Sequence, residues 1–361
     1  MSEEIRKTNT GRQYEFDLAK VAAIFFMVII HVADNMSAVA ETKNAFAVLL
    51  DFTGGPLAAP VFMFAMGVGM VYTKHSEPAD FAKRGLCMIA SGYALNFFRE
   101  TVLMIAAKVL SVDTVYEKAL IDTIGTVDIL HFAGMAFLFA ALFKKLNAAA
   151  PAVFFGALVM QAAGTCVTGM FDAMPKALQY LLGLLFYTNQ YVSFPSLLWF
   201  VYPAAGILFG SVLQHITDKD RFYKSITAGS AVTLTAVTVC VKAMNLDLES
   251  FFTGNEYYVQ NLFGSLWILS IVLIFTGICY AISKRLSERA IRRISETAAS
   301  VNTIYIIQWL LITYTIAVKE LAGLGYLPSA AVIPAGIAFA ICSIILAKLY
   351  RNGKERKCHT K

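Results

Sequence analysis

Charged residues are scarce in this sequence. Asp, Glu, Lys and Arg make up 15% of the 361 residues, whereas a soluble domain carries about 25%. Hydrophobic residues make up 58%, so the deficit of charge indicates an integral membrane protein. The net charge of +6 does not indicate nucleic-acid binding, because the basic residues lie in loops between apolar segments, where they report membrane topology.

Paired cysteines and linkers are also absent. None of the six cysteines forms a C-x-x-C pair. Five of them lie within apolar segments, and we interpret these as small buried residues rather than as disulfides or metal ligands. The sequence has no low-complexity stretch and no linker long enough to separate two domains, so we predict one transmembrane domain over residues 1–361.

Long apolar runs are abundant instead. A membrane-spanning helix needs about 20 mostly apolar residues, and only helices satisfy their backbone over such lengths where barrel patterning is absent. We therefore predict an all-α, polytopic membrane protein with about ten transmembrane helices. They are expected at 18–38, 54–73, 84–107, 124–143, 150–170, 195–214, 225–245, 262–283, 301–318 and 328–348.

Positive charge predicts the orientation of these helices. With the N-terminus in the cytoplasm, 22 of the 30 Lys and Arg residues fall in cytoplasmic segments and 6 in outer segments. Cytoplasmic loops carry such an excess of basic residues. Both termini are therefore predicted to be cytoplasmic, with short tails at 1–16 and 350–361, in a multi-pass protein of the cell membrane.

One apolar run, at 176–191, is too short to span a membrane. Its aromatic and amide-bearing end predicts an interfacial or re-entrant helix on the outer side. Such a helix either covers a site or lies at the surface.

The first predicted helix carries ionisable residues at both ends. Asp17 and Lys20 are three residues apart near the cytoplasmic face, where they can pair, and Lys20 can also extend to the interface. His31 follows about 16 Å further along the helix, with Asp34 just beyond it. Ionisable groups inside a span usually face a cavity or a partner, although a single histidine can also be structural.

The fourth predicted helix repeats this pattern. Asp128 and His131 are again three residues apart at the outer end, so His31 with Asp34 and Asp128 with His131 form two His/Asp pairs at similar depth. A histidine oriented by a carboxylate is suited to general-base or acyl-accepting chemistry. Zinc binding is a weaker alternative, because neither pair has the double-histidine i, i+4 spacing. Whether the two pairs face one another stays open.

The third predicted helix carries charge in two places. Lys83 and Arg84 stand at its cytoplasmic start, where they either hold a phosphate-bearing donor or follow the positive-inside rule. Asn96, Arg99 and Glu100 interrupt its outer half. These three either form a structural ion pair or contact a substrate.

The ninth predicted helix presents polar residues on one face. Asn302, Tyr305 and Gln308 are spaced by three. They either make interhelical hydrogen bonds or line a pore.

The order of these stretches resembles the membrane acyltransferase superfamily, which includes the acyltransferase-3 O-acetyltransferases and the heparan-α-glucosaminide N-acetyltransferase-like proteins. The acyltransferase-3 signature is an arginine, ten residues and a histidine. Lys20 and His31 stand at these positions, and Gln308 stands where a histidine often occurs in the family. No histidine lies between Val32 and Lys74, so His31 follows the acyltransferase-3 pattern rather than the heparan type. Further similarity lies in 60–70, 80–97, 128–142, 194–210 and 301–311.

The resemblance implies that an acyl group is transferred across the membrane. Acetyl-CoA or another acyl-CoA would be the donor, and no metal is expected. The acceptor would be a hydroxyl or amine of an extracytoplasmic glycan or small molecule, and His31 would act as general base or carry the acyl group. The candidate catalytic residues are His31, Asp34, Asp128 and His131, the donor-binding candidates are Arg12, Lys20, Lys83 and Arg84, and the substrate-contacting candidates are Asn96, Arg99, Glu100, Tyr305 and Gln308.

Several alternatives stay open. Ionisable residues in the outer halves of ten helices could form a proton-coupled transporter or a lipid-linked-sugar exporter, although the internal repeats of many transporters are not evident. An inactive relative acting as a sensor or assembly factor is a third alternative. The lipid bilayer is an expected partner, nucleic acid is not, and a homodimer stays open as the oligomeric state.

Overall fold

The computed structural model describes residues 7–42, 44–109, 119–168, 170–171 and 173–359. The described residues form helices joined by loops, with no strand among them. The prediction of an all-α, polytopic fold is therefore confirmed. The outermost parts of the two predicted tails, residues 1–6 and 360–361, lie outside the described residues.

Eight helical segments of the described chain are long and apolar enough to cross a membrane, and each matches one of the ten predicted spans. Two of them are interrupted by a short turn. The eight are α1 (Tyr14–Met36), α3 with α4 (Ala45–Gly54 and Ala59–Tyr72), α9 (Ala150–Val167), α11 with α12 (Ser196–Trp199 and Val201–Leu213), α13 (Lys219–Ala243), α14 (Leu262–Ser283), α16 (Val301–Leu321) and α17 (Ser329–His359).

The other two predicted spans are also helical, but they are shorter or more charged. α8 (Ile129–Lys145) has 17 residues. α5 (Pro78–Asn96) carries Asp80, Lys83 and Arg84 near its start. It continues through one π-helical turn, η1 (Phe97–Thr101), into α6 (Val102–Val109).

Close helix packing in this fold depends on glycine. A Cβ added to Gly67 of α4 would overlap the carbonyl oxygen of Pro203 in α12, and one added to Gly206 of α12 would overlap that of Phe64. Small residues let membrane helices approach until their backbones touch. The short α4 and α12 can therefore form a tight pair without long side chains between them.

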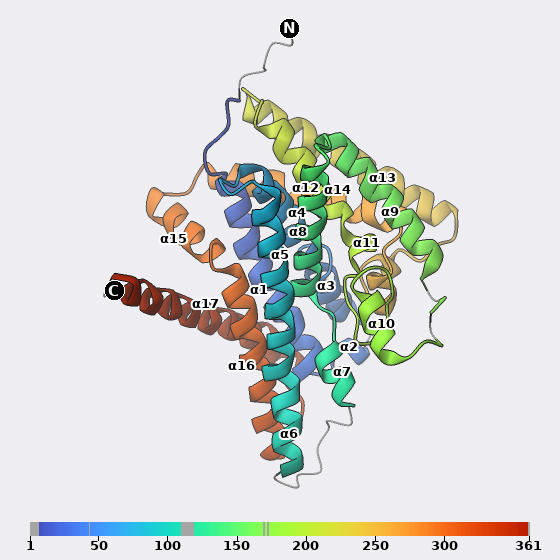
Figure 1. The fold of residues 1–361 in the computed structure, drawn as a ribbon, viewed down its shortest axis with the longest axis vertical. Coiled ribbons are helices and arrows are strands. Elements are labelled where there is room, and N and C mark those ends of the chain that lie inside the picture. The colour runs from blue at the N-terminus through green and yellow to red at the C-terminus, as the bar shows by residue number, and fades with distance from the viewer. Residues whose placement is uncertain (1–6, 43, 110–118, 169, 172, 360–361) are drawn as a thin grey trace.

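α1 lies at the centre of the molecule (Figure 1) and contacts α3, α4, α14, α16, α17 and α15 (Glu288–Ala298). One apolar cluster joins α1, α4, α11, α12 and α14 around side chains such as Trp199 and Tyr202. A second cluster joins α1 to α8, α16 and α17 around Ile24, Val28 and Ile304. Both Lys20 and His31 therefore lie on the helix that connects the two halves of the core.

The segments predicted to be cytoplasmic meet at one end of the bundle, which we call the basic end. The Thr8 amide donates to the Gln214 carbonyl at 2.7 Å, and Lys219 pairs with Glu15 at 2.8 Å. The basic end comprises residues 7–20, 73–84, 144–150, 211–224 and 284–301.

The segments predicted to be extracytoplasmic meet at the opposite end of the bundle, which we call the loop end. The Leu327 amide donates to the Met36 carbonyl at 2.8 Å, and the Tyr257 hydroxyl donates to the Gly55 carbonyl at 3.1 Å. The structure thus sorts the loops into the same two groups as the charge count. Which group faces the cytoplasm stays a prediction.

The segment at 176–191 contains a short helix, α10 (Lys176–Gly183), that is fastened to α7 (Leu120–Gly125) at the loop end. Lys176 and the Tyr180 hydroxyl both donate to the buried Asp122 carboxylate, at 2.7 and 2.6 Å respectively. Burial raises the pKa of Asp122, but these hydrogen bonds outweigh burial and hold that pKa below its usual value.

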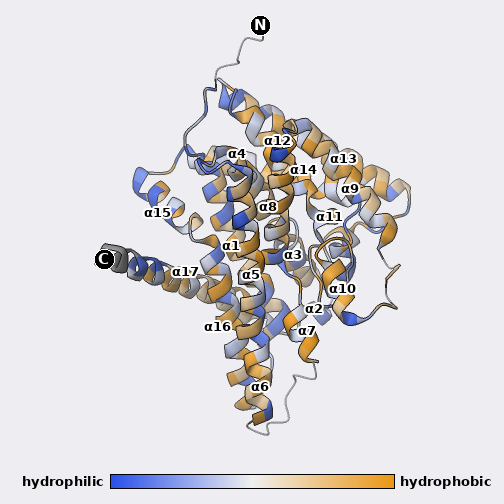
Figure 2. Ribbon diagram, in the orientation of Figure 1, coloured by the Kyte–Doolittle hydropathy of each residue, from blue (hydrophilic) through white to orange (hydrophobic). Residues whose placement is uncertain are grey.

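Apolar residues cover much of the outside of the bundle (Figure 2), including the surfaces of α6, α7 and α10. The predicted burial of the cysteines is wrong for most of those described. Only Cys279 is buried, whereas Cys87, Cys166, Cys240 and Cys342 are exposed. Apolar outer faces of membrane helices contact lipid, so a small apolar side chain there needs no protein partner.

Candidate active site

His31 lies in the last two turns of α1 and is held by α16. Its Nδ1 lies 3.2 Å from Oε1 of Gln308, and its ring lies against Trp309 with centroids 4.2 Å apart. An amide oxygen only accepts hydrogen bonds, so Nδ1 carries the hydrogen and Nε2 keeps the lone pair. The structure therefore gives His31 the tautomer whose Nε2 can accept a proton.

A buried charged network lies behind Trp309. The Arg99 guanidinium stacks over the Trp309 ring, 4.5 Å from its centroid. It also reaches Asp128 at 3.3 Å and Glu100 at 3.2 Å. Arg99 and Glu100 lie in the π-helical turn η1, and such turns frequently occur at functional sites.

Tyr305 joins this network to the cavities described below. Its hydroxyl donates to Oδ2 of Asp128 at 2.5 Å, the same oxygen that Arg99 contacts. Asn96 donates to the carbonyls of Ile124 and Thr126, which fixes the chain just before Asp128. The Asp128 carboxylate is thus held by groups from three helical segments.

His131 has a different environment from His31. The Asp128 amide donates to Nδ1 of His131 at 3.2 Å, and the Asp128 carboxylate accepts from the Ile129 amide at 2.7 Å. This is a capping box with a histidine at the third position of α8. The His131 ring is fully buried and packs where Gly92 has no side chain, so it lines neither cavity.

A cavity of about 380 Å³ opens at the loop end, and we call it the outer cavity. Its polar lining comes from His31, Asp34, Asp51 and Asp128. Aromatic side chains of Tyr305 and of the loops form much of the remaining wall, namely Phe194, Phe252, Tyr257 and Tyr258.

The aromatic wall depends on the connection between α13 and α14, which contains η2 (Glu249–Phe251) and η3 (Asn255–Tyr258). Trp199 Nε1 donates to the Tyr258 carbonyl at 3.0 Å, which fastens this connection to α11. Burial raises the pKa of Tyr258, and the charges of Asp34 and Asp128 raise it further. Tyr258 therefore lines the cavity as a neutral phenol.

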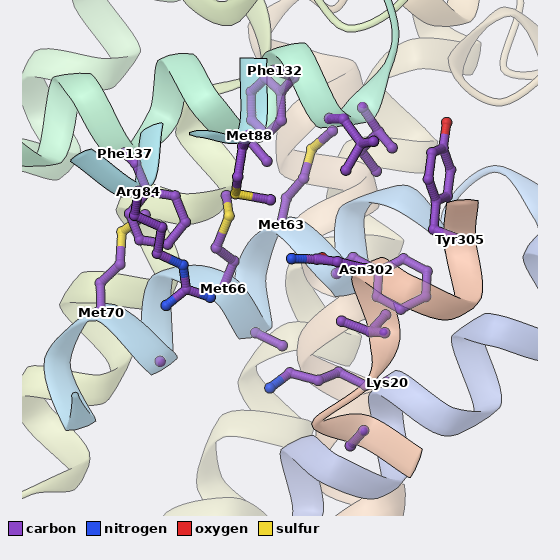
Figure 3. A pocket seen from close by; sticks show the side chains of 18 of the residues that line it. Lys20, Met63, Met66, Met70, Arg84, Met88, Phe132, Phe137, Asn302 and Tyr305 are labelled. Atoms are coloured by element: carbon purple, nitrogen blue, oxygen red, sulfur yellow. The ribbon is translucent and has the colours of Figure 1, made fainter. Parts of the chain in front are cut away.

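A second cavity, of about 330 Å³, lies at the basic end, and we call it the inner cavity. Figure 3 shows the nitrogens of Lys20, Arg84 and Asn302 pointing toward the same space. The Arg84 guanidinium also stacks over the Phe137 ring at 4.5 Å. Five methionines line this cavity, and they are Met27, Met63, Met66, Met70 and Met88.

The two cavities are separated by a thin wall. Met27, Ile129 and Tyr305 line both of them. Lys20 lies on one side of this wall and His31 on the other, both on α1. Two cavities that enter from opposite ends of the bundle therefore meet near its middle.

Asp17 and Lys20, whose spacing allows them to pair, do not form an ion pair in the structure. Asp17 instead pairs with Arg12 at 2.5 Å and accepts from the Ser295 hydroxyl at 2.8 Å. These partners come from the segment before α1 and from α15, and they leave Lys20 facing the inner cavity. Among the described residues, no ion pair is formed with Lys20.

The structure separates the predicted site residues into four places. Lys20 and Arg84 line the inner cavity, and His31, Asp34 and Asp128 line the outer one, with Tyr305 in both. Arg12 and Lys83 line neither and belong to the surface of the basic end. The remaining candidates form the layer behind the cavity walls, and they are Asn96, Arg99, Glu100, His131 and Gln308.

Sequence reasoning missed several lining residues. Asp51 lies in α3, outside the predicted span at 54–73, and the apolar residues on both sides of this carboxylate were the available signal. The methionines at 63, 66 and 70 recur at spacings of three and four, which places them on one helix face. Tyr257 and Tyr258 lie in a loop, and no local pattern indicates that such a loop folds back over a cavity. Within the described part of the chain, no cluster of three or more His, Cys, Asp or Glu residues is arranged to hold a metal ion.

Comparison with known proteins identifies the family of the chain. A model of the acyltransferase-3 family, described as an acyltransferase domain, matches residues 13–348. No curated protein and no solved structure matches the chain. The family match begins just before α1 and ends within α17, so it includes both cavities and the wall between them. The chain therefore belongs to the acyltransferase-3 family of membrane acyltransferases.

Proposed function

We propose that this protein transfers an acyl group, such as acetyl, from cytoplasmic acyl-CoA to a hydroxyl or amine of an extracytoplasmic acceptor, such as a sugar. One observation carries the proposal. The inner cavity with its cations and the outer cavity with His31 enter from opposite ends and share Met27, Ile129 and Tyr305 in their linings. A donor and an acceptor held on opposite sides of a membrane could meet at such a wall.

The inner cavity suits the acyl-bearing arm of the donor. Lys20 and Arg84 supply basic side chains to its lining, and both residue types bind phosphates in proteins. Methionine side chains are flexible and polarisable, so they adapt to a linear chain that passes between them. The basic end as a whole would attract a polyanionic donor.

The outer cavity suits the chemistry of the acceptor. Nε2 of His31 would take the proton of the acceptor hydroxyl as its oxygen attacks the thioester carbonyl. The new C–O bond forms, the C–S bond breaks, and the CoA thiolate regains the proton from His31. In an alternative order, the acyl group is first transferred covalently to Nε2 of His31 and then to the acceptor. This order requires the same residue and the same tautomer.

Family membership favours an enzyme over the transporter alternative, because the matched domain is an acyltransferase domain. The inactive-relative alternative rests on Lys20 and Gln308, which differ from the resembled pattern. In the structure both have defined positions, Lys20 in the inner cavity and Gln308 at Nδ1 of His31.

Acyl transfer can be tested with purified full-length protein in lipid nanodiscs. Acetyl-CoA labelled on the acetyl group is supplied with a mixed pool of cell-surface glycans, and both free CoA and labelled glycan are measured. We expect both products from the native chain and a loss on the order of a hundredfold or more in His31→Gln, because a general base contributes at least that factor.

The matched control is His215→Gln. His215 is exposed at the basic end and contacts the Ser211 carbonyl, so this change should leave transfer intact. No CoA release with any acceptor or acyl length would overturn the proposal. Full activity in a folded His31→Gln variant would retain the enzyme but assign the base to another residue.

A further inference from the structure

The outer cavity contains two carboxyl groups that no other group of the described chain pairs with. Asp34 is exposed to the cavity and Asp51 is half-buried in its wall. Within the described chain, no ion pair or hydrogen bond reaches either carboxylate, and no Lys or Arg lines this cavity. Asp128 differs from them, because Arg99 and Tyr305 hold it.

A carboxylate within a spanning segment is unfavourable unless it has a counter-charge or faces water. The fold provides a cation for Asp128 and for Glu15 but none for Asp34 or Asp51. A bound cationic group would supply the missing counter-charge.

The loop at the mouth of the outer cavity is also acidic. Between Lys242 and Lys284 the sequence contains no Lys or Arg. The connection between α13 and α14, which forms the mouth, carries only acidic charges, at Asp247, Glu249 and Glu256. A cleft lined by charges of one sign raises the local concentration of ligands of the opposite sign.

The aromatic wall is a second feature that favours a cation. Phe194, Phe252, Tyr257 and Tyr258 contribute to one cavity together with the two carboxylates. The faces of aromatic rings attract ammonium groups, and proteins use such walls to recognise them. Tyr258 is neutral, so it adds a ring face without adding charge.

We propose that the acceptor of this protein carries a cationic amine beside the group that is acylated, as an amino sugar or an amino alcohol does. The ammonium would lie against Asp34, Asp51 and the aromatic wall, and a neighbouring hydroxyl would face His31. This inference rests on the proposed function, because it names the class of acceptor for the same site.

The test compares two probes that differ in one group. Methyl glucosaminide carries an ammonium at the position where methyl glucoside carries a hydroxyl. Their affinities for the full-length protein in nanodiscs are measured by calorimetry without acyl-CoA, at neutral pH. We expect the amino sugar to bind more tightly by on the order of tenfold, with a preference that decreases as salt is added.

Three variants test whether the preference for the amino sugar arises in the outer cavity. Asp34→Asn and Asp51→Asn each keep the shape of the side chain and should remove most of the preference. Glu41→Gln removes an exposed carboxylate of α2 (Val39–Thr42) at the same end of the molecule but outside the cavity, and should retain the preference.

The two proposals fail in different ways. Equal binding of the probes, no binding of either, or a preference that survives in both Asp variants would overturn the cationic acceptor. Preferential binding of the amino sugar without any release of CoA would retain the cation site and overturn acyl transfer. His31→Gln should keep the binding preference and lose transfer, which separates the anchoring group from the reacting one.

Discussion

At the scale of single residues, Gln308 decides which nitrogen of His31 can accept a proton. Its amide oxygen accepts from Nδ1–H, so the lone pair stays on Nε2. Trp309 supports the same ring from one side, and Arg99 lies on the far side of Trp309. The geometry of His31 therefore depends on α16 more than on either predicted carboxylate partner.

Substitutions at Gln308 should separate its hydrogen bond from its volume. Gln308→Leu removes the acceptor, so both tautomers of His31 become accessible and transfer should decrease on the order of tenfold or more. Gln308→Glu keeps an acceptor of the same shape and should retain most of the activity. Steady-state rates with labelled acetyl-CoA measure both. Equal rates in the native chain and the Leu variant would show that Gln308 does not position His31.

The sequence predicted part of the site well, because helical spacing is a local property. Asn302, Tyr305 and Gln308 were placed on one face of a helix, and the structure puts them in the inner cavity, in the wall and against His31. The same reasoning made His131 a second catalytic candidate beside His31. The Asp-x-x-His spacing at 128–131 is instead that of a capping box, and tertiary packing against Gly92 buries the ring.

At the scale of elements, most helices could be predicted and their connections could not. Hydropathy identified ten helical segments, because the apolar length that a membrane requires is visible in sequence. Several of their ends were misplaced, such as the start of the segment that begins at Ala45 rather than at residue 54. The π-helical turn η1 and the folded-back loop with η3 depend on tertiary contacts, such as the bond from Trp199 to Tyr258.

The pairing of α4 with α12 should be sensitive to a single methyl group. Gly67→Ala places a Cβ against the backbone of Pro203, so α4 and α12 must move apart to make room for it. We therefore expect a lower melting temperature and a loss of roughly 1–3 kcal/mol in the free energy of unfolding. Gly229→Ala adds the same methyl to open space on α13 and should be neutral or slightly stabilising. Thermal unfolding of both variants in detergent measures the difference. Similar melting temperatures would argue against close packing at Gly67.

The attachment of α10 to α7 should depend on pH through Asp122. The pKa of Asp122 is lower in the folded protein than its unfolded value of about 3.9, so its ionisation stabilises the folded state. This contribution is fully present above that unfolded value and is lost as the pH falls through the lower folded pKa. Hydrogen exchange of residues 119–125 and 176–183 should therefore be slower in the native chain than in Asp122→Asn near neutral pH. The difference should disappear in strong acid, and a difference that grows in acid would contradict this assignment.

At the scale of the whole molecule, the loops form two groups that agree with the charge count. The prediction that the basic end is cytoplasmic can be tested with single cysteines in a chain whose native cysteines are replaced by serine. Asp247→Cys at the loop end should react with an impermeant maleimide in intact cells. Glu288→Cys at the basic end should react only after the membrane is permeabilised. Both native side chains are exposed, so a cysteine at either position can be labelled once the reagent reaches it. The reverse pattern would invert the proposed direction of transfer.

The wall between the cavities also has a consequence for the membrane itself. Water that enters either cavity from its own end meets the side chains of Met27, Ile129 and Tyr305, which line both cavities. Two of these three are apolar, and the third turns its hydroxyl toward Asp128. These shared residues therefore have a second task, because a continuous water path between the two cavities would let ions leak across the membrane.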